Sequence, residues 1–468
     1  MEPPEGVVAD LVAAGEHLPA VPALALTPTV EREVRAGARS DDPWNAVRRW
    51  ISVRGDRTGA LSGLRVSLKD SVAIGGVPLT CGSAALPDFI PSGDASVVRE
   101  LLDAGAELVA VTTMDDLAFS GGGDSCVDGP VLNPHDPTRS AGGSSSGAAA
   151  SLHLDGVDVA IGTDQGGSSR VPASWCGVLG LKPTRGLVPY TGVVPGEPSL
   201  DHIGLLARTT GVLRRVLGVV AIDDGTDLRQ RGVPRLSEST SAGPLGARAV
   251  VLRALVDRSA PEVAAAFRRD CDAVRALGVN VVETDLDPDA FGPVAAGLFV
   301  EGLAATLAGT ASGFGHRHVE WRELTRALED GVRRHEERLS LAVRVTLAAA
   351  RTLARTRPGE AYSRAAAQAG ALTAAFTALL AEFDFVLTPT TPFPPFPVMA
   401  AGPEDQVRRG WAVLGNTGFA NVTGQPALSV PLSLADGMPS GLQIVGAHGT
   451  DLRLLDLAAA LLQEAPRD

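Results

Sequence analysis

Residues 157–170 read VDVAIGTDQGGSSR. The first five residues are mostly apolar and predict a β-strand, and they run directly into a turn of glycine and serine. Consecutive backbone N–H groups in such a turn can hold an oxyanion. The segment therefore predicts an α/β sheet with a candidate site where one of its strands ends.

Apolar runs on both sides of this segment extend the predicted sheet. Residues 64–68 read as a strand that runs straight into Lys69,. Further strands are expected at 107–112, 385–387, 428–432 and 442–445, with helices at 95–104, from 148 and at 451–462. Residues 260–380 have mostly helical spacing, and residues 46–51 read as the end of a helix. This alternation predicts an α/β sheet covered on both faces.

Lysine occurs only twice, at Lys69 and Lys182, in a chain of 468 residues with a net charge of −13. An acidic balance argues against a protein that coats nucleic acid. No stretch approaches the roughly 20 apolar residues that cross a bilayer, and the acidic N-terminus lacks the basic start of a signal peptide. The four cysteines lie far apart. We therefore expect reduced thiols, no structural zinc and a cytoplasmic protein.

Several familiar kinds of site fit the sequence poorly. Residues 143–147 match the G-x-S-x-G motif of serine hydrolases with Ser145 as nucleophile, but no buried strand precedes them,. Neither lysine stands in a P-loop, and no strand–G-x-G-x-x-G–helix fingerprint occurs. His202 is read as a packed or surface histidine. The His316-x-His318-x-Glu320 cluster lacks the helical spacing of the H-E-x-x-H zinc motif,.

The remaining constellation is Lys69 with two serines, Ser144 and Ser168, each in or next to a polar turn. A serine hydroxyl is a weak nucleophile until a base takes its proton. Without histidine, a lysine can be that base only when it is neutral, and burial lowers its pKa toward that state. Each residue alone also has a structural explanation, because Gly/Ser turns are common and Lys69 with Asp70 could be a surface pair.

Around these residues the sequence resembles the amidase signature family. The matching segments are 67–70 (SLKD), 142–147 (GGSSSG), 162–173 (GTDQGGSSRVPA), 177–184 (GVLGLKPT) and 421–427 (NVTGQPA). The intervals of 75 residues from Lys69 to Ser144 and 24 residues from Ser144 to Ser168 also agree with the family. The resemblance covers nearly the whole chain and is greatest to bacterial amidases of broad aliphatic and aromatic range.

The resemblance implies the amidase-signature fold, an α/β architecture with a large mixed twisted β-sheet that helices cover on both faces. It also implies an N-terminal helical segment over residues 1–60 and a single amidase domain over 61–468. Within that domain we expect a catalytic core over about 61–215 and a helical substrate-covering region over about 260–410.

The activity that the resemblance implies is hydrolysis of a carboxylic amide to the acid and ammonia or an amine. Neutral Lys69 would take a proton from Ser144, which is expected on a cis peptide bond, and Ser144 would take one from the nucleophile Ser168. The implied oxyanion hole consists of the backbone N–H groups of Gln165, Gly166, Gly167 and Ser168. Thr163, Asp164 and Arg170 would support the loop by hydrogen bonds. No cofactor or metal is implied.

Departures from the family pattern bear on the substrate. Ser169 stands where the family usually has Ile or Val, and residues 111–116 read VTTMDD where the family has Lys-Thr-Asn-Met-Asp-Glu. The segment by which tRNA-dependent amidotransferases hold a carboxylated substrate is not recognisable in residues 300–360. We therefore expect a stand-alone enzyme for a small-molecule amide, without nucleic acid or membrane, and we allow a homodimer. The alternative is an acyl-transfer or amide-tailoring enzyme of a biosynthetic pathway that uses the same acyl-enzyme.

Two regions are expected to wall the substrate pocket. The first is the loop that contains Phe119, Ser120, Gly121 and Gly122. The second is residues 290–420, which contain the aromatic residues Trp321, Phe393, Phe396 and Trp411.

Overall fold

A mixed β-sheet of 12 strands organises the described part of the chain. The computed structural model describes residues 26, 35–36, 41–55, 58–236, 243–288, 291–307, 321–398 and 402–463. In chain order the strands are β1 (Arg35–Ala36), β2 (Val47–Arg54), β3 (Arg65–Lys69), β4 (Glu107–Thr112), β5 (Val159–Asp164), β6 (Leu179–Lys182), β7 (His202–Ala207), β8 (Arg248–Leu252), β9 (Asn280–Thr284), β10 (Phe385–Pro389), β11 (Ala427–Ala435) and β12 (Met438–Val445).

The sheet combines an antiparallel centre with parallel strands on either side. Its strand order is β1-β2-β4-β3-β5-β7-β6-β11-β12-β10-β8-β9. β7 pairs antiparallel with β5 and β6, and β11 pairs antiparallel with β6 and β12. β3 runs parallel to β4 and β5, and β8 runs parallel to β9 and β10. The large mixed sheet expected from the sequence is confirmed.

The central strand β5 is buried along its whole length. Val159, Ala160 and Ile161 have no exposed surface, because helices cover the sheet on both sides and a strand in that position is apolar on both faces. Its last residue, Asp164, pairs with His202 of β7. The strand therefore delivers the following glycine and serine turn to the edge of the sheet.

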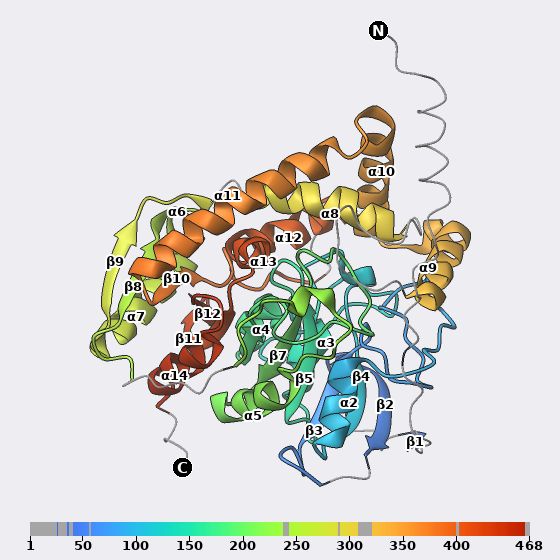
Figure 1. Ribbon diagram of the computed structural model, residues 1–468, viewed down its shortest axis with the longest axis horizontal. Helices are drawn as coiled ribbons and strands as arrows, with labels where there is room; N and C mark the ends of the chain where they lie inside the picture. Colours follow the sequence, from blue (N-terminus) through green and yellow to red (C-terminus); the bar gives the residue numbers. More distant parts are fainter. Residues whose placement is uncertain are drawn as a thin grey trace.

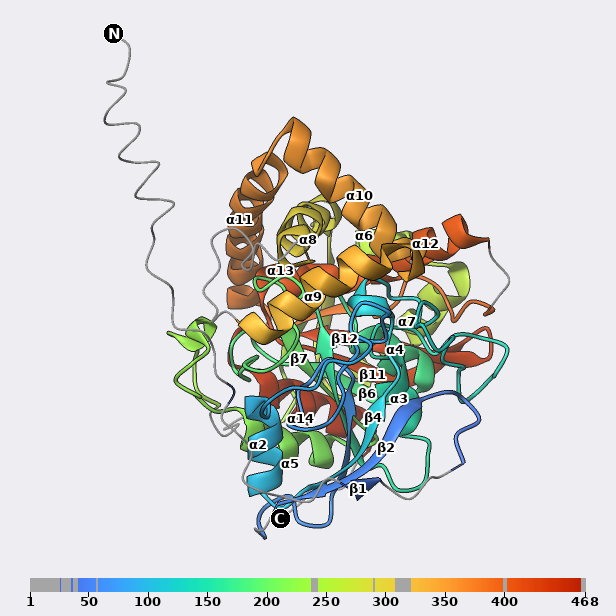
Figure 2. The same cartoon turned by 90° about the vertical axis from the view of Figure 1, so that its right-hand side faces the viewer.

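Helices cover both faces of the sheet (Figure 1). They are α2 (Ser96–Asp103), α3 (Ser146–Ser151), α4 (Arg170–Cys176), α5 (Thr210–Val220), α6 (Arg253–Asp257), α7 (Pro261–Ala276), α8 (Phe291–Leu307), α9 (Arg322–His335), α10 (Leu341–Thr356), α11 (Glu360–Glu382), α12 (Pro403–Ala412), α13 (Gly418–Thr423) and α14 (Asp451–Leu461). Figure 2 shows α2, α5 and α14 on one side of the strands and α3, α4 and α7 on the other. The predicted covering of both faces is confirmed.

The helices α8 and α10 to α13 lie together over one edge of the sheet, at the top of Figure 1. Within this group α8 packs against α10, α11 and α13. The helical spacing predicted over residues 260–380 is borne out in the described part of that range, except at β9. This strand extends the sheet beside β8. The arrangement places a helical cap above the end of β5.

Most of the local predictions are confirmed. The strands expected at 64–68, 107–112, 385–387, 428–432 and 442–445 are β3, β4, β10, β11 and β12, and the helices expected at 95–104 and 451–462 are α2 and α14. Periodicity identified these elements because each buries a continuous apolar face.

The prediction of a helix end at residues 46–51 is wrong. Val47–Arg54 forms β2, which pairs antiparallel with β4. Ile51 and Val53 are buried while their neighbours are more exposed, so the segment follows a period of two and not a helical one,. Much of the remainder of residues 1–60 lies outside the described residues, so the N-terminal helical segment stays a prediction.

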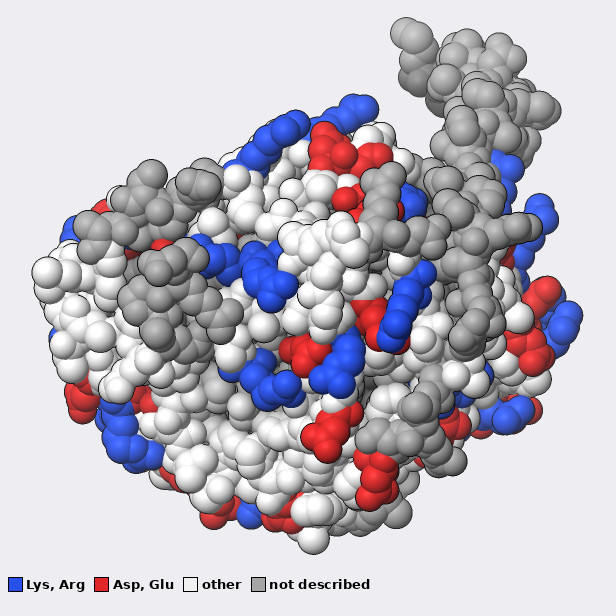
Figure 3. Space-filling view, turned by 90° about the horizontal axis from the view of Figure 1, so that it is seen from below, with Lys and Arg blue, Asp and Glu red and all other residues white. Residues whose placement is uncertain are grey.

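Acidic and basic side chains are interspersed on the face seen from below in Figure 3. Ion pairs such as Arg54–Glu107 at 2.7 Å and Arg408–Glu404 at 2.6 Å occur among the described residues. On that face the described charges do not gather by sign.

One described helix, α11, has the length and composition of a membrane-spanning segment, with a mean hydropathy of 1.2. The sequence-based statement that no stretch approaches this composition therefore does not hold for Glu360–Glu382. In the fold, α11 packs against α8 and α13 (Figure 1). Its residues Tyr362, Phe376 and Leu380 are buried. Length and composition alone also fit a helix of this cap.

Candidate active site

Lys69 ends β3 and has no exposed surface. Its Nζ lies 2.7 Å from Ser144 Oγ and 2.8 Å from Thr163 Oγ1. Burial lowers the pKa of Lys69 from its ordinary value near 10.5 to about 7, although the nearby carboxylates of Asp115 and Asp164 raise it. A substantial fraction of this lysine is therefore neutral near pH 7, as a base requires.

Ser144 lies in the loop that leads into α3, and the peptide bond between Gly143 and Ser144 is cis. The carboxylate of Asp115 packs closely against Gly143 of this loop. A Cβ at position 143 would lie 1.8 Å from Asp115 Oδ2, so only glycine fits there. The backbone N–H of Asp115 also donates to the Ser144 carbonyl at 3.3 Å. These contacts fix the backbone that directs Ser144 toward Lys69.

Ser168 lies in the turn between β5 and α4, and it lines a cavity together with Gln165 and Gly166. Its carbonyl accepts a hydrogen bond of 2.9 Å from the N–H of Ser145, which ties the turn to the Ser144 loop. Gly167 has a φ of +136°, and a Cβ there would lie 2.1 Å from Thr417 Oγ1. The turn thus needs glycine both for its backbone conformation and for its close approach to Thr417.

The Gly167 N–H donates to Asp164 Oδ1 at 2.8 Å. We expected the Gly167 N–H to be one of four oxyanion-hole donors, but its hydrogen bond to the Asp164 carboxylate occupies it. Our expectation for the oxyanion site accordingly rests on the N–H groups of Gln165, Gly166 and Ser168.

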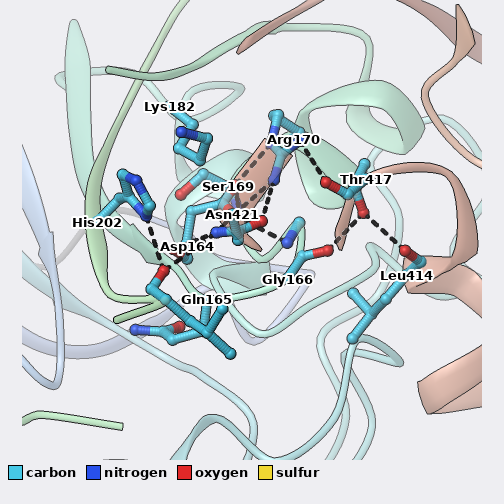
Figure 4. Close-up of polar contacts among 12 residues, drawn as sticks. Asp164, Gln165, Gly166, Ser169, Arg170, Lys182, His202, Leu414, Thr417 and Asn421 are labelled. Atoms are coloured by element: carbon cyan, nitrogen blue, oxygen red, sulfur yellow. Dashed lines mark hydrogen bonds and ion pairs between the residues drawn. The ribbon is translucent and has the colours of Figure 1, made fainter. Parts of the chain in front are cut away.

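A buried ion pair between Asp164 and Arg170 lies behind the turn (Figure 4). Both side chains have no exposed surface, and Arg170 donates to the carboxylate from Nε at 3.0 Å and from Nη2 at 2.8 Å. Burial alone would raise the pKa of Asp164. The Arg170 guanidinium and the Asn421 amide outweigh that effect and hold this pKa well below its ordinary value. The carboxylate therefore stays ionised and keeps its contacts to the turn.

Three residues that the sequence did not single out complete this network. Asn421 Nδ2 donates to the Asp164 carbonyl at 2.8 Å, and Asn421 Oδ1 accepts from Arg170 Nη2 at 2.6 Å. Arg170 Nη1 donates to Gln443 Oε1 at 2.7 Å and to the Thr417 carbonyl at 3.0 Å. Asn421 begins one of the segments that match the amidase signature, but that resemblance assigned it no role.

Thr417 connects the C-terminal segment directly to the turn. Its Oγ1 donates to the Gly166 carbonyl at 2.5 Å (Figure 4). The backbone around it is held in turn by Arg170 through the Thr417 carbonyl. Thr417 therefore fixes the orientation of the peptide unit between Gly166 and Gly167, whose N–H donates to Asp164.

The cavity beside Ser168 is mostly apolar. It is lined by Ala118, Phe119, Gln165, Gly166, Ser168, Leu200, Gly292, Ala295, Ala296, Phe299, Trp411, Leu414, Gly415, Gly418 and Phe419. Of the predicted pocket residues, Phe119 and Trp411 line it. The sequence did not single out Phe299, because α8 is apolar on nearly every side and shows no face that points to a cavity,.

The other predicted pocket residues do not line the cavity. Ser120, Gly121 and Gly122 are buried beside the cavity and not among its lining residues, with the Gly121 N–H donating to the Gly410 carbonyl at 2.9 Å. Trp321 packs against Phe89, with ring centroids 5.7 Å apart. Phe393 and Phe396 pack against Trp175. These aromatic residues support the core and not the cavity.

The competing sites of the sequence analysis have structural explanations. Ser145 precedes α3 and donates from Oγ to the Thr163 carbonyl at 3.1 Å, so no nucleophile elbow forms there. His202 is buried, and burial followed by the charges of Lys182 and Arg185 lowers its pKa well below the ordinary value. The His316-x-His318-x-Glu320 cluster lies outside the described residues. Within those residues, no three His, Cys, Asp or Glu side chains gather as metal ligands do.

The second lysine, Lys182, is also fully buried. Its Nζ donates to the Pro183 carbonyl at 3.2 Å. Figure 4 shows it near His202, on the far side of the network from Leu414, which lines the cavity. Of the two lysines, the structure thus places Lys69 within hydrogen-bond distance of Ser144 Oγ.

Comparison with known proteins supports a family assignment over most of the chain. The family model described as Amidase matches residues 44–455. An enantioselective amidase of Rhodococcus rhodochrous is 36% identical over 420 residues, covering 86% of this chain and 80% of that protein. A glutamyl-tRNA(Gln) amidotransferase subunit from Halobacterium salinarum is 34% identical over 90% of this chain and 99% of its own length. A solved structure described as an amidase superposes with a TM-score of 0.72 at 30% identity, over 87% of this chain and 86% of the other.

Proposed function

The chain belongs to the amidase family, and from that premise we propose that it hydrolyses a carboxylic amide to the acid and ammonia or an amine. One observation carries this proposal. A fully buried lysine, Lys69, lies 2.7 Å from Ser144 Oγ, next to a turn whose Ser168 opens into an apolar cavity. A neutral amine, a relay hydroxyl and a second serine are the groups that a histidine-free serine hydrolase needs.

The first step that we propose is acylation of Ser168. Neutral Lys69 takes the Ser144 hydroxyl proton while Ser144 takes the proton of Ser168 Oγ, which attacks the carbonyl carbon of the amide. The carbonyl π electrons move to oxygen, and the N–H groups of Gln165, Gly166 and Ser168 stabilise that oxyanion. The engaged Gly167 N–H supports the turn in this scheme instead of binding the oxyanion directly.

Breakdown of the tetrahedral intermediate completes the reaction. The carbon–nitrogen bond breaks, and the leaving amine receives a proton from Ser144, which is in turn reprotonated by Lys69. Water then attacks the acyl-enzyme and loses its proton to the same relay. The acid leaves and the Ser168 hydroxyl is restored. Thr163, Asp164 and Arg170 would take no part in these proton transfers and would hold the turn by the hydrogen bonds described above.

A panel of simple amides tests this proposal through release of ammonia. We expect hydrolysis by the native chain and a loss of roughly four or more orders of magnitude in kcat for Ser168→Ala. The matched control is Ser363→Ala, which removes an exposed serine hydroxyl from α11 and should leave the rate unchanged. Full activity of Ser168→Ala would refute the assignment of the nucleophile.

Acyl transfer to an amine is the second candidate, because known relatives include amidotransferase subunits. The same acyl-enzyme would form, and an amine would then replace water. Mass analysis of products made with and without hydroxylamine separates the two reactions. A hydroxamate that replaces most of the acid at low acceptor concentration would favour the transferase.

A further inference from the structure

The cavity beside Ser168 has a chemistry that points to a substrate class. Among the described residues that line it, none is charged. Apart from Ser168, side-chain polar atoms come only from Gln165 and the indole of Trp411. The Gln165 amide is engaged within the protein, since its Nε2 donates to Tyr190 Oη at 2.8 Å and its Oε1 accepts from Thr163 Oγ1 at 3.4 Å. Little capacity remains to bind a polar acyl group.

One face of α8 forms the floor of this cavity. Gly292, Ala295, Ala296 and Phe299 all line it, and their spacing of three, four and seven residues places them on a single side of the helix,. Three of these four side chains are small. The helix therefore approaches the cavity without filling it, and bulk added at Ala295 or Ala296 would project into the space next to Ser168.

Aromatic rings close the remaining sides. The rings of Phe119 and Phe299 lie edge to face at 5.4 Å between centroids, and those of Phe299 and Trp411 do the same at 5.4 Å. Such an arrangement is stiff, and it offers ring faces and edges to a further ring. The space that the rings and α8 border measures about 720 Å³ when its opening to solvent is included.

We propose that this cavity binds the acyl part of an uncharged amide whose acyl group is aromatic or bulky and apolar, with the Ala295 and Ala296 face of α8 as the steric determinant. The inference rests on the proposed amidase function. A carboxylate or ammonium on the acyl group would lose its hydration in an apolar cavity without gaining an opposite charge there, so charged amides should be rejected.

A matched substrate pair tests the polarity of the site. 4-Methylbenzamide and 4-carbamoylbenzoate have similar size and shape and differ in a methyl group against a carboxylate. We expect kcat/KM to be at least about 100-fold higher for 4-methylbenzamide. Equal or better hydrolysis of the carboxylate would overturn this inference and leave the proposed function intact. If neither of these nor acetamide is hydrolysed, the proposed function itself fails and the inference falls with it.

Two variants test the location of the site. Ala295→Leu and Ala296→Leu should each lower kcat/KM for 4-methylbenzamide at least about tenfold more than that for acetamide. Activity on acetamide shows that each variant is folded. Ala375→Leu, which adds the same bulk at an exposed position of α11, is the control and should change neither. An equal loss for both substrates, or no loss for either, would overturn the assignment of α8 as the steric determinant.

Discussion

The turn over residues 163–170 and the cavity wall that faces it differ in polarity and in the number of their side-chain hydrogen bonds. The turn, with Lys69 and Ser144 behind it, consists of buried polar groups with many defined hydrogen-bond partners. The wall, contributed mainly by α8 and by residues 411–419, consists of glycine, alanine, leucine and aromatic side chains. The two regions meet at Ser168.

This difference indicates how each region responds to change. A buried polar group that loses its partner leaves a desolvated donor, acceptor or charge, so a substitution in the turn should be costly for every substrate. A change in the apolar wall alters volume and shape, and its effect should depend on the substrate. We therefore assign the chemistry to the first region and the choice of substrate to the second.

The largest expected effect separates the two lysines. Lys69→Arg should be as inactive as Lys69→Ala, with kcat lower by roughly three or more orders of magnitude, because a guanidinium stays charged and cannot act as the base. Burial lowers the pKa of Lys182 well below its ordinary value, and Lys182→Arg would place a permanently charged guanidinium at this site, which does not contact Ser144, so it should alter stability more than kcat,. Steady-state kinetics on one amide compare the three variants. An active Lys69→Arg enzyme would break the assignment of Lys69 as the base.

The next effect concerns the stability of the turn. Arg170→Met leaves the Asp164 carboxylate buried without its guanidinium, and should lower the free energy of unfolding by about 3–5 kcal/mol,. Urea unfolding measures this. Arg408→Ala, which removes an exposed ion pair with Glu404, is the control and should cause no measurable change,. Similar losses in both variants would contradict the expectation that the buried ion pair contributes more to stability than the exposed one.

Thr417 tests the boundary between the two regions. Thr417→Val removes the hydroxyl that donates to the Gly166 carbonyl while keeping the shape of the side chain. We expect kcat to fall about fivefold with little change in KM, for small and bulky amides alike, because a hydrogen bond of this kind contributes about 1 kcal/mol. Thr417→Ser should restore the rate. A loss that varies with the size of the acyl group would instead assign Thr417 to the wall.

The sequence was informative about the turn because its residues are local. Strand β5 and the glycine and serine turn follow each other without interruption, and the apolar run together with the matching segments located them, whereas α4 was not predicted. Thr417 and Gln443, by contrast, contact Arg170 from 247 and 273 residues away along the chain. No local pattern in the sequence predicts such contacts, because they depend on how the C-terminal strands and helices pack against the turn.

The wall was harder to predict for a different reason. Phe119 and Trp411 were among the candidates, but so were Trp321, Phe393 and Phe396, whose rings pack against other aromatic residues. Aromatic side chains are frequent in cores as well as in pockets, so residue type alone does not separate the two. Similarly, β2 was predicted as the end of a helix, because its pairing with β4 is a tertiary contact that overrides local preference,.

The smallest expected effect is a shift in pH dependence. The pKa of Lys69 is lowered to about 7 by burial, against the opposing influence of Asp115 and Asp164. Because the neutral amine is the active form, kcat/KM should rise with pH through a single ionisation near pH 7 and then level off.

Asp115→Asn removes one carboxylate that favours the ammonium form, so the pKa of Lys69 should fall and the midpoint should move to lower pH. The Asn Oδ1 can keep the bonds from the N–H and Oγ of Ser125. In Ala296→Leu, a change in the wall, the midpoint should stay in place. A pH midpoint that moves in Ala296→Leu and not in Asp115→Asn would contradict the assignment of the chemistry to the turn and of substrate choice to the wall.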